Sequence, residues 1–466
     1  MSRNLKMSKY NFICLDKEGD LILYNFLNGI SSLTKIKKSD IDSFTNGFLT
    51  NSEKLYAACN EYKEMANTLL KLGILVDDDT DESVLYDAKQ YSEIYDTKLY
   101  LTIFPTGKCN FRCPYCFETS QDFSRDTMTS DSQDAILKFV QKTISNHRML
   151  HVSWFGGEPL VASEVVENLS DKFIQICNVR HIPYSADMVT NGFLLDSNMF
   201  DTLYKLQVYD YMITIDGFKK QHDKRRFTYD GKGSYDTIMD NLLKIRNNKQ
   251  YKFANIMIRV NMSTGFLEML DEFVNFLGSS FADDPRFKFM FVPVVKFSSS
   301  HFSNEIIYSN HKELYMRLSK NDVYTNKLYP NMLKLTSILP QQKCPACLKN
   351  SYVITSDLSV YKCNAHYDFD INKIGRVNLN GDLLIDETLH RRWYLMKKSI
   401  QRIPESCNDC FYSPCCLNID SGCPVSYLKT NPDVTLCPLK DENKKNNIVE
   451  TILYAADIYP CTTLAL

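Results

Sequence analysis

The cysteines are the residues of this sequence whose number and spacing point most directly to chemistry. The chain has 16 of them, with three in Cys109–Cys116, nine in Cys344–Cys437 and the rest scattered. Buried structural cysteines scatter with the hydrophobic core, whereas metal-binding cysteines cluster. We therefore expect two metal-binding regions, in a chain whose thiols stay reduced and build no disulfide framework.

The first group, Cys109, Cys113 and Cys116, has the spacing C-x3-C-x2-C and follows a predicted strand at residues 99–104. Three thiolates can hold three irons of a [4Fe–4S] cube, which leaves the fourth iron open to a small molecule. A closed site would need a fourth cysteine nearby, and none follows locally. Structural zinc is the weaker alternative, because such sites usually show paired C-x2-C or C/H sets.

With Tyr115 before its last cysteine, this motif resembles the signature of the radical S-adenosylmethionine (SAM) superfamily. The resemblance implies a [4Fe–4S] cluster on these three cysteines, with SAM chelated to the open iron by its amino and carboxylate groups. In that family one electron from the cluster cleaves SAM, and a 5′-deoxyadenosyl radical abstracts a hydrogen atom. The cofactor supplies this chemistry, while the protein orients and shields it.

A second signature, Gly156-Gly157-Glu158-Pro159, follows the next predicted strand. The resemblance implies that this turn contacts the methionine amino group of SAM. Residues at later strand ends also match the family and imply contacts to the ribose or carboxylate of SAM, with a strand-end cap or an ion pair as the alternative for each. Together with Tyr115, the expected cofactor-binding residues there are Asn191, Asp216 and Arg259.

A further match to the family is His222-Asp223-x-x-Arg226, which follows the predicted strand at 211–215. His222 is a candidate proton carrier, because the ordinary pKa of histidine lies near neutral pH. The alternative is a structural hydrogen bond. The sequence identifies no catalytic base.

These motifs need elements that bring them together. Residues from about 98 to 325 alternate between strand-like and helix-like stretches, which predicts an α/β fold with a parallel sheet. The resemblance implies a partial (β/α)6-type radical SAM barrel. Sites on such sheets lie at the carboxyl ends of the strands, where the motifs fall. The strands are expected at 99–104, 151–155, 185–190, 211–215, 256–261 and 288–294.

The second cysteine group can supply the eight thiolates that two fully ligated [4Fe–4S] clusters need. It resembles the SPASM extension, which carries auxiliary clusters in radical SAM peptide maturases. By that resemblance one cluster takes Cys407, Cys410, Cys416 and Cys437. The other takes Cys344, Cys347, Cys363 and Cys423, and Cys415 is spare.

Two positions depart from the SPASM pattern. Six residues separate Cys416 from Cys423 where the family has three, and Leu358 stands where the family has a glycine before Cys363. The alternatives are a single auxiliary cluster and a zinc ribbon built from the paired C-x2-C sets. Because this region shows little continuous periodicity, we expect it to need metal to fold.

Residues 1–90 predict a small α+β unit. It resembles the winged-helix-like module with which peptide-modifying radical SAM proteins bind the leader of a precursor peptide, often as an added strand. DNA binding is the alternative, but the segment is not markedly basic. The expected elements are strands at 10–16, 21–26 and 74–76, a turn at 17–20 and a helix from about 51 to 72.

Composition places the chain among ordinary soluble globular proteins, with 44% hydrophobic and 24% charged residues. A formal net charge of −2 gives no basic field for nucleic acid. We find no secretory signal and no apolar run of membrane-spanning length, so we expect a cytoplasmic protein. The expected domains are 1–90 for peptide recognition, 91–325 for the radical SAM core and 326–450 for the SPASM-type clusters.

The resemblance spans nearly the whole chain and implies a maturase of a ribosomally made peptide that forms a cross-link, with a thioether as the first choice. The expected partners are a precursor peptide with its leader and a reductant such as flavodoxin or ferredoxin, without nucleic acid or membrane. One alternative is an anaerobic sulfatase-maturating type of enzyme, which oxidises Cys or Ser of a protein. Another, from a different class, is a cluster-containing redox sensor that binds DNA.

Overall fold

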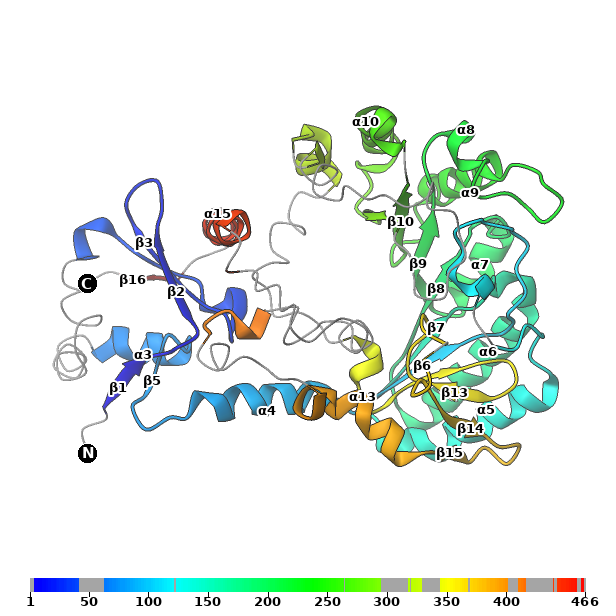
Figure 1. The fold of residues 1–466 in the computed structure, drawn as a ribbon, viewed down its shortest axis with the longest axis horizontal. Helices are drawn as coiled ribbons and strands as arrows, with labels where there is room; N and C mark the ends of the chain where they lie inside the picture. Colours follow the sequence, from blue (N-terminus) through cyan, green and yellow to red (C-terminus); the bar gives the residue numbers. More distant parts are fainter. Residues whose placement is uncertain are drawn as a thin grey trace. The chain divides into compact units, whose positions relative to one another are not determined.

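The chain is described by a computed structural model over residues 4–41, 63–120, 123–263, 265–294, 317–318, 320–328, 344–367, 369–400, 410–415, 439, 442–458 and 462–464 (Figure 1). It divides into two compact units, each considered by itself. One comprises Met1–Tyr95, Asn331–Cys347 and Tyr394–Leu466. The other comprises Asp96–Pro330 and Leu348–Trp393.

The second unit is built on a sheet whose first six strands are parallel and neighbour each other in chain order. This arrangement confirms the α/β fold with a parallel sheet. Strand β6 pairs on its other side with β12, so the described sheet is open between β6 and β11. The six strands are β6 (Lys98–Ile103), β7 (Met149–Trp154), β8 (Tyr184–Thr190), β9 (Val208–Thr214), β10 (Asn255–Met262) and β11 (Phe287–Pro293).

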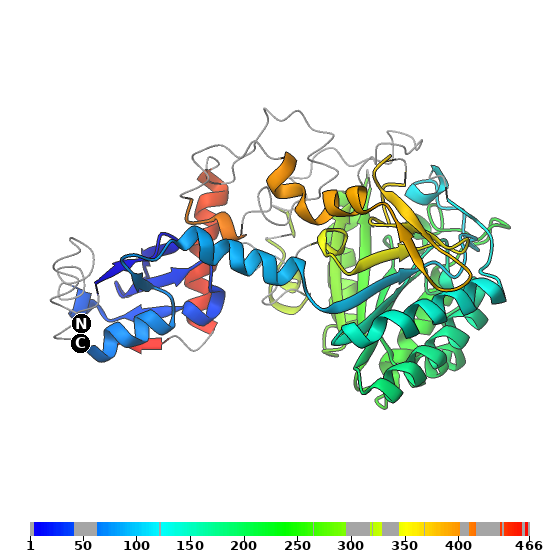
Figure 2. The same ribbon diagram turned by 90° about the horizontal axis from the view of Figure 1, so that it is seen from below.

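Helices follow the strands and lie along one face of the sheet (Figure 2). On β6 the alternate residues Leu99, Leu101 and Ile103 are fully buried, while Tyr100 and Thr102 are half-buried on the other face. A strand with one helix-covered face gives this period of two. The helices are α5 (Ser130–Thr143), α6 (Ser163–Arg180), α7 (Ser197–Lys205), α8 (Lys219–His222), α9 (Tyr235–Asn247) and α10 (Leu270–Phe281).

Four short strands that the sequence analysis did not anticipate extend this sheet beyond β6. They are β12 (Ser351–Ile354), β13 (Ser359–Tyr361), β14 (Lys373–Val377) and β15 (Leu383–Ile385), and α13 (Glu387–Ile400) follows. All residues of β12 and β13 are buried, so the pattern lacks the alternation that marks a half-exposed strand.

Leu358 lies in the turn between β12 and β13 with a φ of 65°. A left-handed conformation costs a non-glycine residue about 1–2 kcal/mol, which accounts for glycine at this position in the family. Here the side chain of Leu358 is only 2% exposed, so burial of its apolar surface offsets the strain.

The first unit contains two small sheets. In one, β1 (Leu5–Met7) pairs antiparallel with β5 (Leu75–Asp77). The other has the order β16-β4-β3-β2, in which β16 comes from the far end of the sequence. Its strands are β2 (Asn11–Leu15), β3 (Leu21–Asn25), β4 (Thr34–Ile36) and β16 (Thr462–Leu464).

Helices of the first unit contribute to two apolar cores. Leu69 of α3 (Lys63–Lys71) packs in one core with Leu23, and Ile452 of α15 (Glu442–Ile458) packs in the other with Tyr24. The remaining helix is α4 (Glu82–Ile94). No helix in the described part of the chain is long and apolar enough to cross a membrane.

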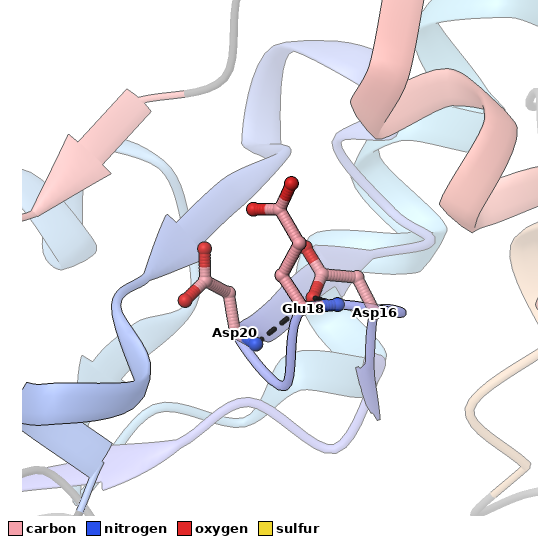
Figure 3. A group of neighbouring side chains, drawn as sticks. All are labelled: Asp16, Glu18 and Asp20. Atoms are coloured by element: carbon pink, nitrogen blue, oxygen red, sulfur yellow. Dashed lines mark hydrogen bonds between the residues drawn. The ribbon is translucent and has the colours of Figure 1, made fainter.

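The predicted turn between β2 and β3 is confirmed and carries three close carboxylates, Asp16, Glu18 and Asp20 (Figure 3). Asp16 accepts hydrogen bonds from the backbone N–H groups of Glu18 and Asp20, both at 2.9 Å. Lys35 lies 2.7 Å from Asp16 and 3.2 Å from Asp20. Ion pairing with Lys35 and the backbone hydrogen bonds to Asp16 therefore account for the close approach of these carboxylates.

Arg286 fastens the start of β11 to the end of α9. Its guanidinium donates to the carbonyl oxygens of Arg246 at 2.7 Å and Asn248 at 2.9 Å, and it pairs with Asp284 at 2.7 Å. Both side chains of the pair are under a tenth exposed. The hydrogen bonds from Arg286 hold the pKa of Asp284 below its ordinary value.

We predict that Arg286→Leu lowers the free energy of unfolding by about 3 kcal/mol or more, because it leaves a buried carboxylate without its main partner. Asp283→Asn is the matched control, since Asp283 is 70% exposed and also pairs with an arginine. The control should cost about 1 kcal/mol or less. Urea unfolding followed by circular dichroism measures both, and equal losses would contradict the assigned role.

Candidate radical SAM site

The predicted site residues meet at the carboxyl edge of the parallel strands. Cys109, Cys113 and Cys116 lie in the loop after β6 and are half-buried. The loops after β7, β8 and β9 contact this cysteine loop or its partners through hydrogen bonds. The expected convergence of the motifs is therefore present in the structure.

The Gly156-Gly157 turn packs directly against the backbone that precedes Cys109. Gly157 N donates to Thr106 O at 3.3 Å, and Glu158 N donates to Lys108 O at 2.9 Å. A Cβ on Gly157 would lie 2.3 Å from Lys108 O, and one on Gly156, whose φ is +114°, 2.6 Å from Thr106 O. These glycines are thus required by the close approach of two loops.

The Glu158 carboxylate is 1% exposed and ties two loops together. It accepts hydrogen bonds from Thr190 Oγ1 at 2.7 Å, Asn191 N at 2.7 Å and Leu160 N at 3.1 Å. Burial raises the pKa of Glu158, and these three hydrogen bonds oppose the rise. Pro159 then begins a short 3-10 helix, Pro159–Ala162, where its missing N–H is not needed.

Asn191 links the end of β8 to the cysteine loop. Its Nδ2 donates to Asn110 Oδ1 at 2.7 Å, and its Oδ1 accepts from Phe193 N at 2.9 Å. The residue is 6% exposed. Both polar ends of its side chain thus have protein partners, as the strand-end alternative to a SAM contact requires.

Tyr115 connects the cysteine loop to the ends of β9 and β10. Its hydroxyl donates to the Asp216 carboxylate and accepts from Arg226 Nη1 at 3.0 Å. Asp216 is fully buried and also accepts from Asn261 N at 3.1 Å. Burial raises the pKa of Asp216, and the charge of Arg226 opposes the rise. Arg226 was not among the expected cofactor-binding residues, although its motif was recognised.

Arg259 joins this group through its neighbour on β10. Its Nε donates to Asn261 Oδ1 at 2.8 Å, and burial lowers the pKa of the guanidinium. The side chain is half-buried, on the sheet face away from the helices. Asn191 and Asp216 are buried, whereas Arg259 is partly exposed. Of these three expected cofactor-binding residues, Arg259 can therefore reach a ligand most easily.

His222 has a structural role in this site. It is fully buried, its Nδ1 accepts from Asp216 N at 3.1 Å, and its Nε2 lies 3.0 Å from Ser234 Oγ. Burial lowers its pKa to about 3. The ring therefore stays neutral near neutral pH, which favours the structural hydrogen bond over the proton carrier.

The donor set fits a cluster better than a single ion. Tetrahedral zinc, with Zn–S near 2.3 Å, would bring thiolate sulfurs to about 3.8 Å from one another. Within the described residues, the one trio of metal-ligating side chains with all its atoms within 4.8 Å is at Asp16, Glu18 and Asp20, so the sulfurs after β6 spread wider. Two buried nitrogen donors of this site, Asn110 Nδ2 and Arg226 Nε, have no hydrogen-bond acceptor among the described residues.

Burial also shows why these thiols need metal to become thiolates. It raises the pKa of Cys109 to about 12 and raises the pKa of Cys113. Bound iron would stabilise the deprotonated form and supply the anionic acceptors that buried donors lack. Cys109, Cys113 and Cys116 are the residues that would hold it.

Five of the nine cysteines in the second group lie among the described residues. Cys344 precedes a short 3-10 helix of the first unit, Pro345–Cys347, and Cys347 ends it, while Cys363 follows β13 in the second unit. Cys410 is half-buried, and Cys415 is buried in a core with Tyr24 and Phe26. Four more lie outside the described residues: Cys407, Cys416, Cys423 and Cys437.

We predict that Glu158→Gln loosens the cysteine loop. In the native protein both carboxylate oxygens accept hydrogen bonds from buried donors, and in the variant the amide N–H₂ must face one of these donors. The expected loss is about 1–3 kcal/mol of stability, with reduced iron retention. Glu164→Gln, an exposed change nearby in α6, is the control and should leave both unchanged. Thermal unfolding and iron analysis after anaerobic reconstitution measure the effect. Normal iron retention and stability in Glu158→Gln would contradict the prediction.

Comparison with known proteins bears on the same residues. A family model described as the radical SAM superfamily matches residues 103–277. The chain is 25% identical over 279 residues to the radical SAM cyclopropyl synthase TigE of Paramaledivibacter caminithermalis, covering 54% of this chain and 56% of that relative. It is 26% identical over 295 residues to a cysteine-type anaerobic sulfatase-maturating enzyme of Clostridium novyi, covering 58% and 74%.

A solved structure, native anSMEcpe with bound AdoMet and Cp18Cys peptide, matches with a TM-score of 0.56 at 19% identity. The match covers 78% of this chain and 100% of that one, and it shows a shared fold. The family match begins at the end of β6 and includes the cysteine loop, the glycine turn and the residues that hold them. The family's cofactors are a [4Fe–4S] cluster and SAM. Residues 103–277 are therefore a domain of the radical SAM superfamily, whose members are enzymes.

Proposed function

We propose that this enzyme is a peptide maturase that removes two hydrogen atoms from a ribosomally made precursor peptide and forms a cross-link, with a thioether as the first choice. The observation that carries the proposal is the additional folded unit outside the radical SAM domain, which combines segments from before and after residues 103–277. Residues 4–41 and 63–95, together with β16 and α15 from the far end of the chain, form two sheets and two apolar cores that SAM cleavage alone does not need. Sulfatase-maturating and cyclopropyl-forming relatives support chemistry on proteins or peptides.

When bound, the cluster and SAM would supply the radical that takes a hydrogen atom from the peptide. The chain holds and shields this chemistry through the loop contacts of Glu158 and Tyr115. The sheet face away from the helices offers half-buried polar groups to a substrate. On it, His151 bonds to Ser185 at 2.7 Å and to Asp187 at 2.8 Å. Thiolates of the second cysteine group are proposed to hold the clusters that accept the second electron.

The first unit is proposed to bind the leader of the precursor peptide. Strand β2 is the outer strand of its sheet in the described part of the chain, opposite β16. An extended peptide can add to such an edge through main-chain hydrogen bonds, which give affinity with little dependence on sequence. A flavodoxin or ferredoxin is the proposed reductant.

Oxidation of Cys or Ser in a protein, as in sulfatase maturation, is the second candidate function. The match to the sulfatase-maturating enzyme of Clostridium novyi covers 74% of that enzyme. This candidate function assigns no role to the first compact unit. A redox sensor that binds DNA is the candidate from another class, and it would show salt-dependent DNA binding without SAM cleavage. The net charge of −2 and the radical SAM domain weigh against it.

We predict that the reconstituted protein, given SAM, a reductant and a short precursor peptide encoded beside its gene, removes two hydrogen atoms from the peptide without oxygen. Mass spectrometry of the intact peptide measures the loss, and chromatography measures 5′-deoxyadenosine. Cys109→Ala should abolish both products. Cys177→Ala is the control, since Cys177 is buried in α6 away from both groups. An unchanged peptide with SAM still cleaved would reject this substrate class and favour the sulfatase-type candidate.

We also predict about 12 irons per chain after anaerobic reconstitution, four for each of three clusters. Replacing Cys109, Cys113 and Cys116 together by alanine should remove about four, because one cluster loses all its ligands. A variant with Cys344 and Cys347 replaced should lose a similar amount. About four irons in the unaltered protein would contradict the auxiliary clusters.

A further inference from the structure

Arg226 is a buried cation with few partners. It is 8% exposed, its Nη1 donates to Tyr115 Oη at 3.0 Å, and its buried Nε has no acceptor among the described residues. No carboxylate in that part of the chain lies within 4.0 Å of its nitrogens. Buried charges in proteins are normally paired, so a guanidinium with few hydrogen bonds can stabilise an anion placed close to it.

The segment that carries Arg226 is fixed to the cysteine loop by backbone pairing. Phe111 and Thr228 form an antiparallel bridge, and Arg112 N donates to Phe227 O at 2.9 Å. The guanidinium lies 5.6 Å from the ring centre of Phe111, which stands between Cys109 and Cys113 in sequence. The charge is therefore held in a fixed place against the cysteine loop.

The nearest carboxylate in the network is kept apart from this charge. Tyr115 stands between the two groups, since it accepts from Arg226 and donates to Asp216. The guanidinium is thus free to interact with an anion at the cysteine loop. A cluster on three thiolates is such an anion, and one-electron reduction makes it more negative. A cation fixed nearby, where little water screens it, favours the reduced state.

We propose that Arg226 is a positioning residue of the cluster, whose fixed charge raises the reduction potential of the [4Fe–4S] centre on Cys109, Cys113 and Cys116. The proposal needs the cluster of the radical SAM domain and does not depend on the peptide chemistry proposed above. It concerns the ease with which an external reductant delivers the electron that SAM cleavage consumes.

The test is a redox titration of the reconstituted protein followed by electron paramagnetic resonance, without SAM or peptide. The titration uses the whole reconstituted protein, and the signal of the first cluster is identified as the one that is lost when Cys109, Cys113 and Cys116 are replaced by alanine. Arg226→Gln should decrease the equilibrium constant for reduction of the cluster at least tenfold. For one electron, this corresponds to a reduction potential that is lower by about 59 mV or more. Arg226→Lys keeps the charge and should restore most of the loss.

Arg112→Gln is the matched control, because Arg112 is an exposed arginine of the same loop that donates to Cys109 O at 2.8 Å and Phe111 O at 2.7 Å. Water screens its charge, so the potential should change far less. Equal shifts in the two variants would assign the effect to loop distortion and overturn the proposal. An unchanged potential in Arg226→Gln would also overturn it, whether or not SAM binding, measured by calorimetry, is weakened.

Asp216→Asn is a second test, to be used if the Arg226→Gln protein does not retain its cluster. It removes a negative charge from the same network, and the amide can still accept from Tyr115. The potential should then move in the opposite direction, to a less negative value. A shift to a more negative value, or none, would contradict a charge effect of this network on the cluster.

Discussion

The buried carboxylate of Glu158 is the interaction on which the shape of the site depends. It fixes the end of β8 to the turn after β7, and the backbone of that turn in turn holds the segment before Cys109. The cysteine loop has little regular structure of its own, so its neighbours must set its conformation. The glycine turn therefore acts as a scaffold for the cysteines, and a side chain on Gly157 would push the two loops apart.

Charge burial is the second constraint, and it follows from the first. Loops packed this closely exclude water from Tyr115, Asp216 and Arg226, each of which is then held by the others. Polar networks in such surroundings are costly when a partner is missing and rigid when all are present. Among the described residues, the buried donors Asn110 Nδ2 and Arg226 Nε lack acceptors, and an anionic cluster on the cysteine loop would complete the network.

The radical SAM domain was largely predictable from sequence, whereas the additional strands were not. Half-buried strands such as β6 show alternation and end at motifs with special residue types, so both strand and site can be located. Strand β12 is buried on both faces and β16 is three residues long, so neither leaves a periodic signal. The pairing of β5 with β1, and of β16 with β4, joins residues far apart in the sequence, which local patterns do not encode. The burial of Arg226 likewise depends on tertiary packing around a motif of ordinary polar residues.

The cysteine loop after β6, fixed by its neighbouring loops, is proposed to carry the cluster that cleaves SAM. The most direct measurement is the formation of 5′-deoxyadenosine from SAM by the reduced, reconstituted protein in the absence of any peptide. We expect slow formation of 5′-deoxyadenosine that disappears when Cys109, Cys113 and Cys116 are replaced and persists when Cys177 is replaced. No 5′-deoxyadenosine from a protein with its full iron content, or the same amount from the triple variant, would contradict it.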